Sequence, residues 1–260
     1  MRYDATLFAQ TAAYYTRYRL PYPEEMFDYL QRALAFDGSG MALDLGCGPG
    51  RLAIALAGKF EEIIGIDPDD EMLIEARKGA QAAGAANVKF RKGSSWDVSP
   101  ELGRFRFAIM GQAFHWMDRV DVLRRLYGML ETNGAVAIVY QHRKGPAEYH
   151  RAEDETVQQF LGERRRAGRG FYQEPEEGHE AVLERSQFEI LEPWTLNYER
   201  EKTIEWAVGH AFSTSRASKR QLGNRADAFA AEFRRRLLQV FPAGKFVLQV
   251  EAKALLGRKS

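Results

Sequence analysis

Between residues 41 and 140 the chain alternates between short apolar runs and segments whose apolar residues recur at helical spacing. The apolar runs lack polar alternation, which is typical of strands buried on both faces. Strands that alternate with amphipathic helices predict an α/β fold, in which helices cover a parallel sheet. The predicted strands are Met41 to Leu45, Ile63 to Ile66, Val88 to Phe90, Phe107 to Met110 and Ala135 to Tyr140.

The segments on either side of this core, residues 41–140, follow other patterns. Residues 1–36 predict a lid of two helices separated by Pro21 and Pro23, because proline pushes its predecessor out of the helical region. Residues 141–186 are polar and predict a helical insertion. Residues 187–260 predict strands and helices of the same domain, ending in a strand over Lys245 to Leu256. We expect residues 1–260 to form a single domain.

Composition narrows the classes of function. The chain has 37 basic and 36 acidic residues and a net charge of +1, so it lacks the positive field that favours nucleic acid. The arginine triplets at 164–166 and 234–236 lie close to acids and are interpreted as solvated helix faces. No apolar run approaches the roughly 18 residues of a membrane span, and the start of the chain lacks the apolar stretch of a signal peptide. We therefore expect a cytoplasmic protein without membrane or nucleic-acid partners.

A glycine-rich turn follows the first predicted strand. Gly46, Gly48 and Gly50 would let the backbone turn tightly and approach a ligand. Asp67 ends the second strand 23 residues (67 − 44) after Asp44, where a nucleotide-binding sheet places the acid that accepts ribose hydroxyls. The glycine spacing differs from the dinucleotide pattern. Asp44 would repel a pyrophosphate but attract a cationic amino-acid tail.

The run from Leu43 to Gly50 resembles motif I of class I S-adenosylmethionine-dependent methyltransferases. The resemblance implies a Rossmann-like, mostly parallel seven-stranded sheet with helices on both faces and an antiparallel last strand. It implies that the loop of Asp44, Gly46 and Gly48 holds the methionine portion of the cofactor. It places Asp67 on the ribose, and Pro68, Met72, Ser94 and Ser95 around the adenine. Ser94 stands where the family often has an acid.

Two further segments resemble a subgroup of this family. The run from Phe107 to Trp116, which contains Gln112, and the run from Tyr18 to Pro23 are similar to small-molecule methyltransferases of the trans-aconitate type. In that subgroup the N-terminal helices close over the cofactor. Tyr14, Tyr18 and Arg19 are therefore candidates for contact with cofactor or substrate, and Gln112 with the cofactor. The alternative is a lid packed on the sheet edge.

His115 and Trp116 follow the fourth strand, where an acceptor would approach the methyl group. Imidazole could act as a general base for a hydroxyl acceptor. A carboxylate acceptor needs no base, and both side chains would then donate hydrogen bonds. The alternative is that Trp116 belongs to the core and His115 caps the next helix. Other aromatic residues that could line the acceptor pocket are Phe171, Tyr172, Trp206 and Phe212.

Other reactive side chains receive a structural interpretation. Cys47 is the only cysteine, so an internal disulfide is excluded and a reducing compartment is favoured. It lies inside the glycine loop, where a small side chain fits. The remaining histidines show no metal-ligand spacing, and no metal is predicted. They are His142, His150, His179 and His210.

The sequence predicts an enzyme that methylates a carboxylate or hydroxyl oxygen of a small molecule and releases S-adenosylhomocysteine. Alternatives are a cofactor-binding protein without turnover and a nicotinamide-dependent dehydrogenase. A nucleic-acid methyltransferase is disfavoured, because the fourth strand lacks the polar, two-proline, aromatic run of enzymes that methylate base amino groups. We expect a monomer or a homodimer.

Overall fold

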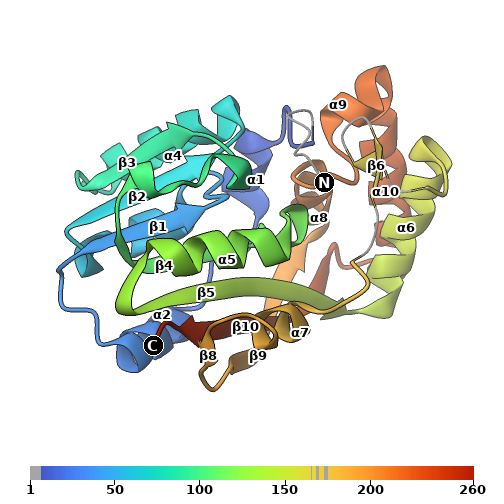
Figure 1. Ribbon diagram of the computed structural model, residues 1–260. Helices are drawn as coiled ribbons and strands as arrows, with labels where there is room; N and C mark the ends of the chain where they lie inside the picture. The colour runs from blue at the N-terminus through green and yellow to red at the C-terminus, as the bar shows by residue number, and fades with distance from the viewer. Residues whose placement is uncertain (1–6, 165, 168–169, 173–174) are drawn as a thin grey trace.

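The computed structural model describes residues 7–164, 166–167, 170–172 and 175–260. Residues 1–6 of the predicted lid and the side chains of Arg165 and Arg166 lie outside the described part. The described chain forms a twisted sheet with helices on both faces and a second group of helices at one end (Figure 1).

The sheet has seven positions, in the order β3, β2, β1, β4, β5, β10 and then β8 with β9. The first five strands are parallel. β10 is antiparallel to β5 on one edge and to β8 and β9 on the other. The prediction of a mostly parallel seven-stranded sheet with an antiparallel last strand is therefore confirmed. The strands are β1 (Met41–Leu45), β2 (Glu62–Asp67), β3 (Val88–Lys92), β4 (Phe105–Gly111), β5 (Leu130–Gly145), β8 (Glu189–Ile190), β9 (Trp194–Thr203) and β10 (Lys245–Arg258).

Helices cover both faces because the central strands are apolar on both. On one face the buried residues come from α2 (Glu24–Leu34), α3 (Arg51–Ala55) and α4 (Asp70–Ala82). On the other they come from α5 (Arg119–Met129) and α7 (His179–Glu184). α1 (Ala12–Tyr18) precedes α2, and the prolines at 21 and 23 separate the two helices as predicted. Single 3₁₀ turns join these elements: η1 (Ala57–Lys59), η2 (Ser95–Asp97), η3 (Pro100–Leu102), η4 (Phe114–Trp116) and η5 (Gly223–Arg225).

The predicted start of the insertion is wrong. β5 does not end at Tyr140 but runs to Gly145, because β10 supplies hydrogen-bond partners along this stretch and Arg143 pairs with Val250. The helical part begins only at α6 (Ala147–Leu161). A two-stranded hairpin, β6 (Arg166–Ala167) and β7 (Gly170–Phe171), then precedes α7.

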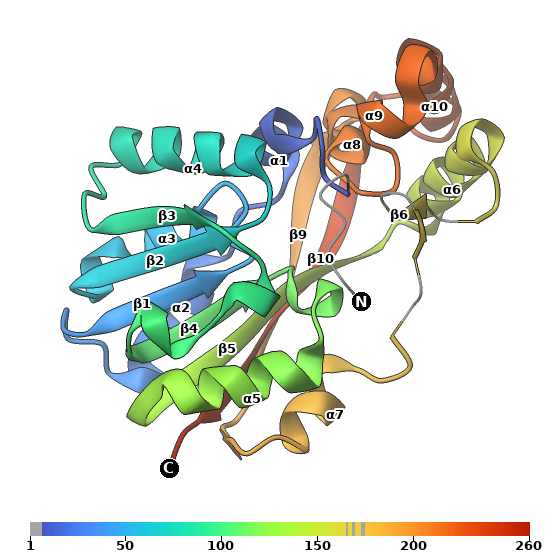
Figure 2. The same ribbon diagram turned by 45° about the horizontal axis from the view of Figure 1, so that its top comes forward.

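A second apolar cluster lies where β5, β9 and β10 project beyond the parallel strands. Figure 2 shows β9 and β10 running from the sheet into this group of helices. Its helices are α6, α8 (Ile204–Phe212), α9 (Lys219–Leu222) and α10 (Ala226–Val240). Tyr149, Phe229 and Phe233 are fully buried there. α1 packs against this group, with Tyr14 and Phe212 rings 5.3 Å apart.

The second arginine triplet lies on α10 and is paired with acids. Arg234 pairs with Glu205, Arg235 with Glu232, and Arg236 with Glu232 and Glu155. This agrees with the interpretation as a solvated helix face. Within the described ranges, none of the helices has the length and apolar character that a membrane crossing requires.

Candidate functional site

A cavity of about 420 Å³ lies at the carboxyl ends of the parallel strands. Its walls come from the glycine loop, the residues after β2, β3 and β4, the end of β5, and the segments around α1, α6 and the turn between α8 and α9. Ligands of open α/β sheets bind at this edge, because the loops there can be shaped without disturbing the sheet.

The glycine loop is built from left-handed backbone. Gly46, Gly48 and Gly50 have backbone φ angles of 73°, 53° and 77°, which residues with a side chain rarely adopt. A Cβ on Gly46 would lie 2.5 Å from the Cβ of Ala113, whereas one on Gly48 would meet no protein atom within 4 Å. Gly46 and Gly48 both line the cavity. The loop therefore presents bare backbone to the cavity.

Asp67 lies at the end of β2 in the cavity wall, where the sequence placed it. Its two oxygens accept hydrogen bonds from the backbone N–H groups of Gly48 (2.8 Å) and Asp69 (2.9 Å). Burial raises the pKa of Asp67 to about 6. Each oxygen keeps a second lone pair, so the carboxylate is held in place and can still accept from a diol. Pro68 and Met72 line the cavity beside it.

Asp44 lies behind the glycine loop rather than in the cavity wall. Only 1% of it is exposed, and one oxygen accepts from the N–H of Ala53 at 3.1 Å. The other oxygen has no hydrogen-bond partner in the described part of the chain. Burial raises its pKa to about 7. Asp44 could therefore act on a bound cation through its charge, but not by lining the cavity.

Ser94 and Ser95 both line the cavity. Ser94 caps the 3₁₀ turn η2, because its hydroxyl accepts from the N–H of Trp96 and donates to Asp97. Asp97 also accepts from the Ser94 N–H, and these bonds lower the pKa of Asp97. An acid is thus present three residues after the family's usual position, but it is engaged in this turn.

Gln112, His115 and Trp116 follow β4 and line the cavity. Gln112 has a φ of 55° and donates from its amide to the carbonyl of Gln141. In η4 the fully buried residue is Phe114, and Asp118 caps α5. The alternative that Trp116 fills the core and His115 caps the helix is therefore wrong.

The lid contributes Tyr15 and Arg19 to the cavity wall. Tyr18, a predicted contact, is not part of that wall: its ring packs against Gly209 of α8 and stacks on Tyr14. The prediction failed because the packing of α1 on α8 turns that face of the helix away from the cavity. Tyr14 and Tyr18 thus pack on α8 rather than on the sheet edge of the alternative, while Arg19 lines the cavity.

Arg51, the first residue of α3, fixes the lid to the glycine loop. Its guanidinium donates to the carbonyls of Tyr15, Thr16, Arg19 and Leu20 at 2.7 to 3.2 Å. These carbonyls lie at and just after the end of α1, where a cation is favoured, and that of Tyr15 also accepts from the N–H of Arg19. The backbone that carries Tyr15 and Arg19 is thus tied directly to α3.

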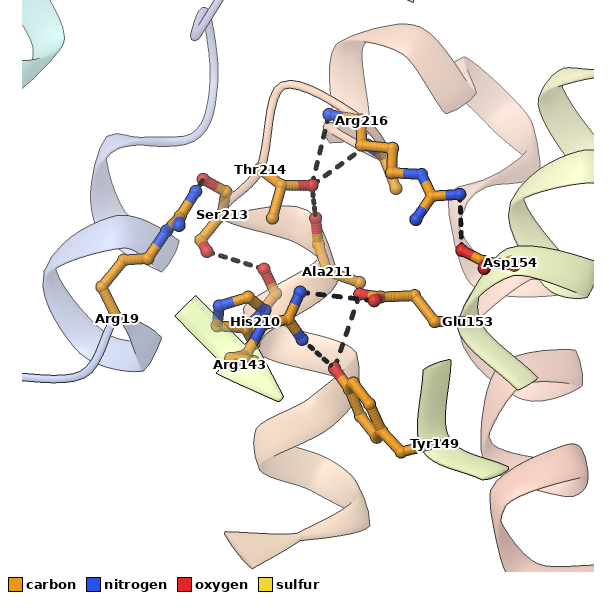
Figure 3. A network of polar contacts seen from close by, with 11 residues as sticks. Arg19, Arg143, Tyr149, Glu153, Asp154, His210, Ala211, Ser213, Thr214 and Arg216 are labelled. Carbon is orange, nitrogen blue, oxygen red and sulfur yellow. Dashed lines mark hydrogen bonds and ion pairs between the residues drawn. The ribbon is translucent and has the colours of Figure 1, made fainter. Parts of the chain in front are cut away.

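The opposite end of the cavity contains residues that sequence reasoning missed. Arg143 donates to the Tyr149 hydroxyl at 2.7 Å and to Glu153 at 3.3 Å, and Arg216 pairs with Asp154 at 2.6 Å (Figure 3). Arg143, Glu153 and Arg216 line the cavity, and so do Gln141, His142, His150, Thr214 and Ser215. These residues come from three separate elements with no common spacing, so the sequence carried no local signal for them.

The aromatic residues suggested for the acceptor pocket lie elsewhere. Trp206 and Phe212 belong to the second apolar cluster. Phe171 is exposed to solvent, and the Arg164 guanidinium lies over its ring. The Tyr172 ring contacts that of Trp116. Cys47 is buried in the glycine loop, and burial raises its pKa, which fits the structural interpretation. Among the described residues, no group of three or more potential ligands could hold a metal ion.

Comparison with known proteins finds a methyltransferase domain and relatives named as methyltransferases. Residues 42–134 match the family model described as methyltransferase domain. An uncharacterised methyltransferase of Schizosaccharomyces pombe is 29% identical over 137 residues, which are 52% of this chain and 53% of that protein. The chain thus spans about half the length of this relative. A protein of Listeria monocytogenes named as an uncharacterised RNA methyltransferase is 33% identical over 78 residues, 30% of this chain and 17% of its own length.

Solved structures share the fold over nearly the whole chain. A protein of Anaeromyxobacter dehalogenans named as a type II methyltransferase superposes with a TM-score of 0.61 at 22% identity, covering 93% of this chain and 97% of its own. Coclaurine N-methyltransferase, bound to N-methylheliamine and S-adenosylhomocysteine, gives 0.55 at 14% identity and covers 91% and 72%. Residues 42–134 therefore match a methyltransferase domain, and the chain shares its fold and sheet order with these structures.

Proposed function

We propose that the protein transfers the methyl group of S-adenosylmethionine to a carboxylate or hydroxyl oxygen of a small molecule, in the manner of the subgroup that includes the trans-aconitate enzymes. One observation carries this proposal. The glycine loop, Asp67, His115, Trp116 and Arg143 all line one cavity. Cofactor and acceptor could therefore meet in the same space.

The residues present fit this cofactor. Bare backbone at Gly46 and Gly48 suits an amino-acid tail, Asp67 suits a ribose diol, and Pro68 and Met72 offer apolar contact to a base. When bound, S-adenosylmethionine supplies an electrophilic methyl group on a sulfonium. The chain's task is then to orient the acceptor in line and to exclude water.

His115 and Trp116 line the cavity from the 3₁₀ turn that follows β4. Toward a hydroxyl acceptor, His115 would take the proton; toward a carboxylate, both side chains would donate hydrogen bonds that hold it in line. A carboxylate suits the arginines at the far end, since guanidinium groups match its geometry.

The size and charge of the site support a small acceptor. About 420 Å³ lies within the range of roughly 300–1,000 Å³ that is usual for small-molecule pockets. The arginine triplet on α10 is paired with acids, which leaves it little attraction for a phosphate backbone.

Calorimetry tests the cofactor assignment. The purified protein should bind S-adenosylhomocysteine, and Asp67→Ala should weaken binding roughly 10-fold or more, because a hydrogen bond to a charged group contributes about 1.5–3 kcal/mol. Asp70→Asn is a matched control, since Asp70 is an exposed partner of Lys92. Binding of NADH with no heat from S-adenosylhomocysteine would contradict the proposal and favour a dehydrogenase.

Turnover is tested separately by screening small acids and alcohols for release of S-adenosylhomocysteine. With an acceptor in hand, His115→Ala should lower kcat/KM, since His115 lines the cavity that we propose for the acceptor. Cofactor binding with no turnover on any acid or alcohol would favour the binding protein without activity.

A further inference from the structure

His142 is an exposed residue of β5 that also lines the cavity. It lies two positions after Tyr140 and on the same face of the strand, because side chains alternate along a strand. The Tyr140 ring packs edge to face against the imidazole, with ring centroids 5.1 Å apart at 69°. The Tyr140 hydroxyl in turn donates to Glu180 of α7 at 3.4 Å. The imidazole is therefore supported by a held ring and is open to both the cavity and solvent.

Glu251 of β10 lies directly opposite His142. The two strands are antiparallel and pair these residues in register, which places their side chains on one face with Cβ atoms about 4.5–5.5 Å apart. The Glu251 side chain is only 14% exposed and pairs with Lys144, the next residue of β5 on this face. A histidine that opens to the cavity thus has a covered carboxylate beside it.

The charges around His142 leave it an unprotonated imidazole at neutral pH. Burial lowers the pKa of His142 below its ordinary value, and Glu251 opposes this effect. The hydrogen bond from Lys144 lowers the pKa of Glu251, so its carboxylate is ionised. An unprotonated imidazole beside an ionised carboxylate is the state that a general base requires. The other titratable groups around this pair are Lys253 of β10, which lowers the pKa of His142, and His179 and Glu180 of α7.

We propose that His142 is a further catalytic residue, which takes the proton of a hydroxyl acceptor, and that Glu251 is its positioning residue. The inference rests on the proposed function and narrows the acceptor to a molecule with an O–H group. It assigns the proton to His142 rather than to His115, because Glu251 stabilises an imidazolium at His142 and solvent can remove its proton. His115 then serves to hold the acceptor in line.

The step balances without a further reactant. The imidazole of His142 accepts the proton as the acceptor oxygen forms its bond to the methyl carbon. The bond from that carbon to sulfur breaks, and its electron pair stays on sulfur, which loses its positive charge. The imidazolium beside Glu251 then passes the proton to solvent, which reaches His142 because the residue is exposed. A carboxylate acceptor has no proton to give at neutral pH and does not need this pair.

An NMR titration tests the pair without an acceptor. The imidazole signals of His142, identified by their loss in His142→Gln, are followed against pH in the wild type and in charge variants. The pKa of His142 should fall in Glu251→Gln, which removes a negative charge, and rise in Lys253→Gln, which removes a positive one. Glu201→Gln is the matched control, since Glu201 is an exposed glutamate of β9 that pairs with Lys245. A pKa that is the same in all of these proteins overturns the pair.

Turnover tests the base. Release of S-adenosylhomocysteine is measured with aliphatic alcohols and phenols, and separately with aliphatic and aromatic carboxylates. A hydroxyl compound should be methylated, and His142→Gln should lower its kcat/KM roughly 100- to 10,000-fold, the usual contribution of a general base. In Glu251→Gln the acid limb of kcat/KM should move to lower pH with the pKa of His142, whereas loss of a purely structural contact would not move it.

Three results overturn the proposal: methylation of carboxylates alone, methylation of neither class, and hydroxyl turnover that survives His142→Gln. Calorimetry with S-adenosylhomocysteine on the same proteins separates this failure from that of the proposed function. Binding without hydroxyl turnover removes only the role of His142, whereas absence of binding removes the cofactor assignment as well. Because His142 is exposed, His142→Gln should keep the Tm of the wild type.

Discussion

The buried carboxylate of Asp44 makes a quantitative prediction about stability and pH. Asp44 is 1% exposed, has one hydrogen bond from Ala53, and has no cationic partner in the described chain. Burial raises its pKa from the ordinary 3.8 to about 7. At about 1.4 kcal/mol per pKa unit, the ionised form costs the fold about 4 kcal/mol at pH 8.

The sign follows from proton linkage. The folded state binds the Asp44 proton more tightly than the unfolded state, so the contribution of Asp44 to stability is most favourable below about pH 4 and falls as the pH rises toward 7. Asp44→Asn removes this dependence. Its amide leaves donors unpaired at a pH-independent cost of about 1–3 kcal/mol.

The measurement compares the variant with the wild type at two pH values. Because the cost of the amide does not depend on pH, it cancels in this comparison. Unfolding free energies of the wild type and Asp44→Asn are taken from urea titrations at pH 5 and pH 8 without cofactor. From pH 5 to pH 8, the free energy of unfolding of the variant should rise by about 2–3 kcal/mol relative to that of the wild type. The reason is that about two pKa units separate pH 5 from the pKa of Asp44 in the folded state. Asp67→Asn should show a smaller gain, because the pKa of Asp67 is raised only to about 6.

A difference between variant and wild type that does not change with pH would refute this reasoning. It would mean that Asp44 titrates normally, and hence that the space behind the glycine loop is hydrated or holds a cation. The predicted cost also has a functional meaning, since an ionised carboxylate close to the loop favours a cationic tail or sulfonium.

Three further predictions follow from packing. Arg51→Met should weaken S-adenosylhomocysteine binding roughly 10-fold and speed hydrogen exchange in α1, because the end of α1 loses four hydrogen bonds; unchanged exchange would refute the link. Gly46→Ala should lower stability by about 2–3 kcal/mol, because its Cβ meets Ala113, while Gly48→Ala should cost about 1 kcal/mol yet obstruct binding; equal losses of stability would contradict this. Phe229→Ala, in the second apolar cluster, should cost about 3–5 kcal/mol in urea unfolding and leave m unchanged.

The sequence by itself determined the parallel core and the part of the cavity wall that the glycine loop and Asp67 form. Strand β1, the glycine loop and Asp67 lie within one short stretch of chain, and their pattern is local: apolar runs buried on both faces, then glycines where the backbone must be left-handed. The residues after β4 were predictable for the same reason, because the end of a parallel strand fixes the edge at which they lie.

Only the tertiary structure decided the other end of the site. Gln141, His142 and Arg143 are polar and predict the start of a helical insertion, yet they continue β5 because β10 supplies their hydrogen bonds. Whether Tyr15 or Tyr18 faces the cavity depends on Gly209 of α8, far along the chain. Contacts between distant segments produce no periodic pattern in the sequence. Which residues meet depends on the position and shape of the other segment, which local spacing does not encode.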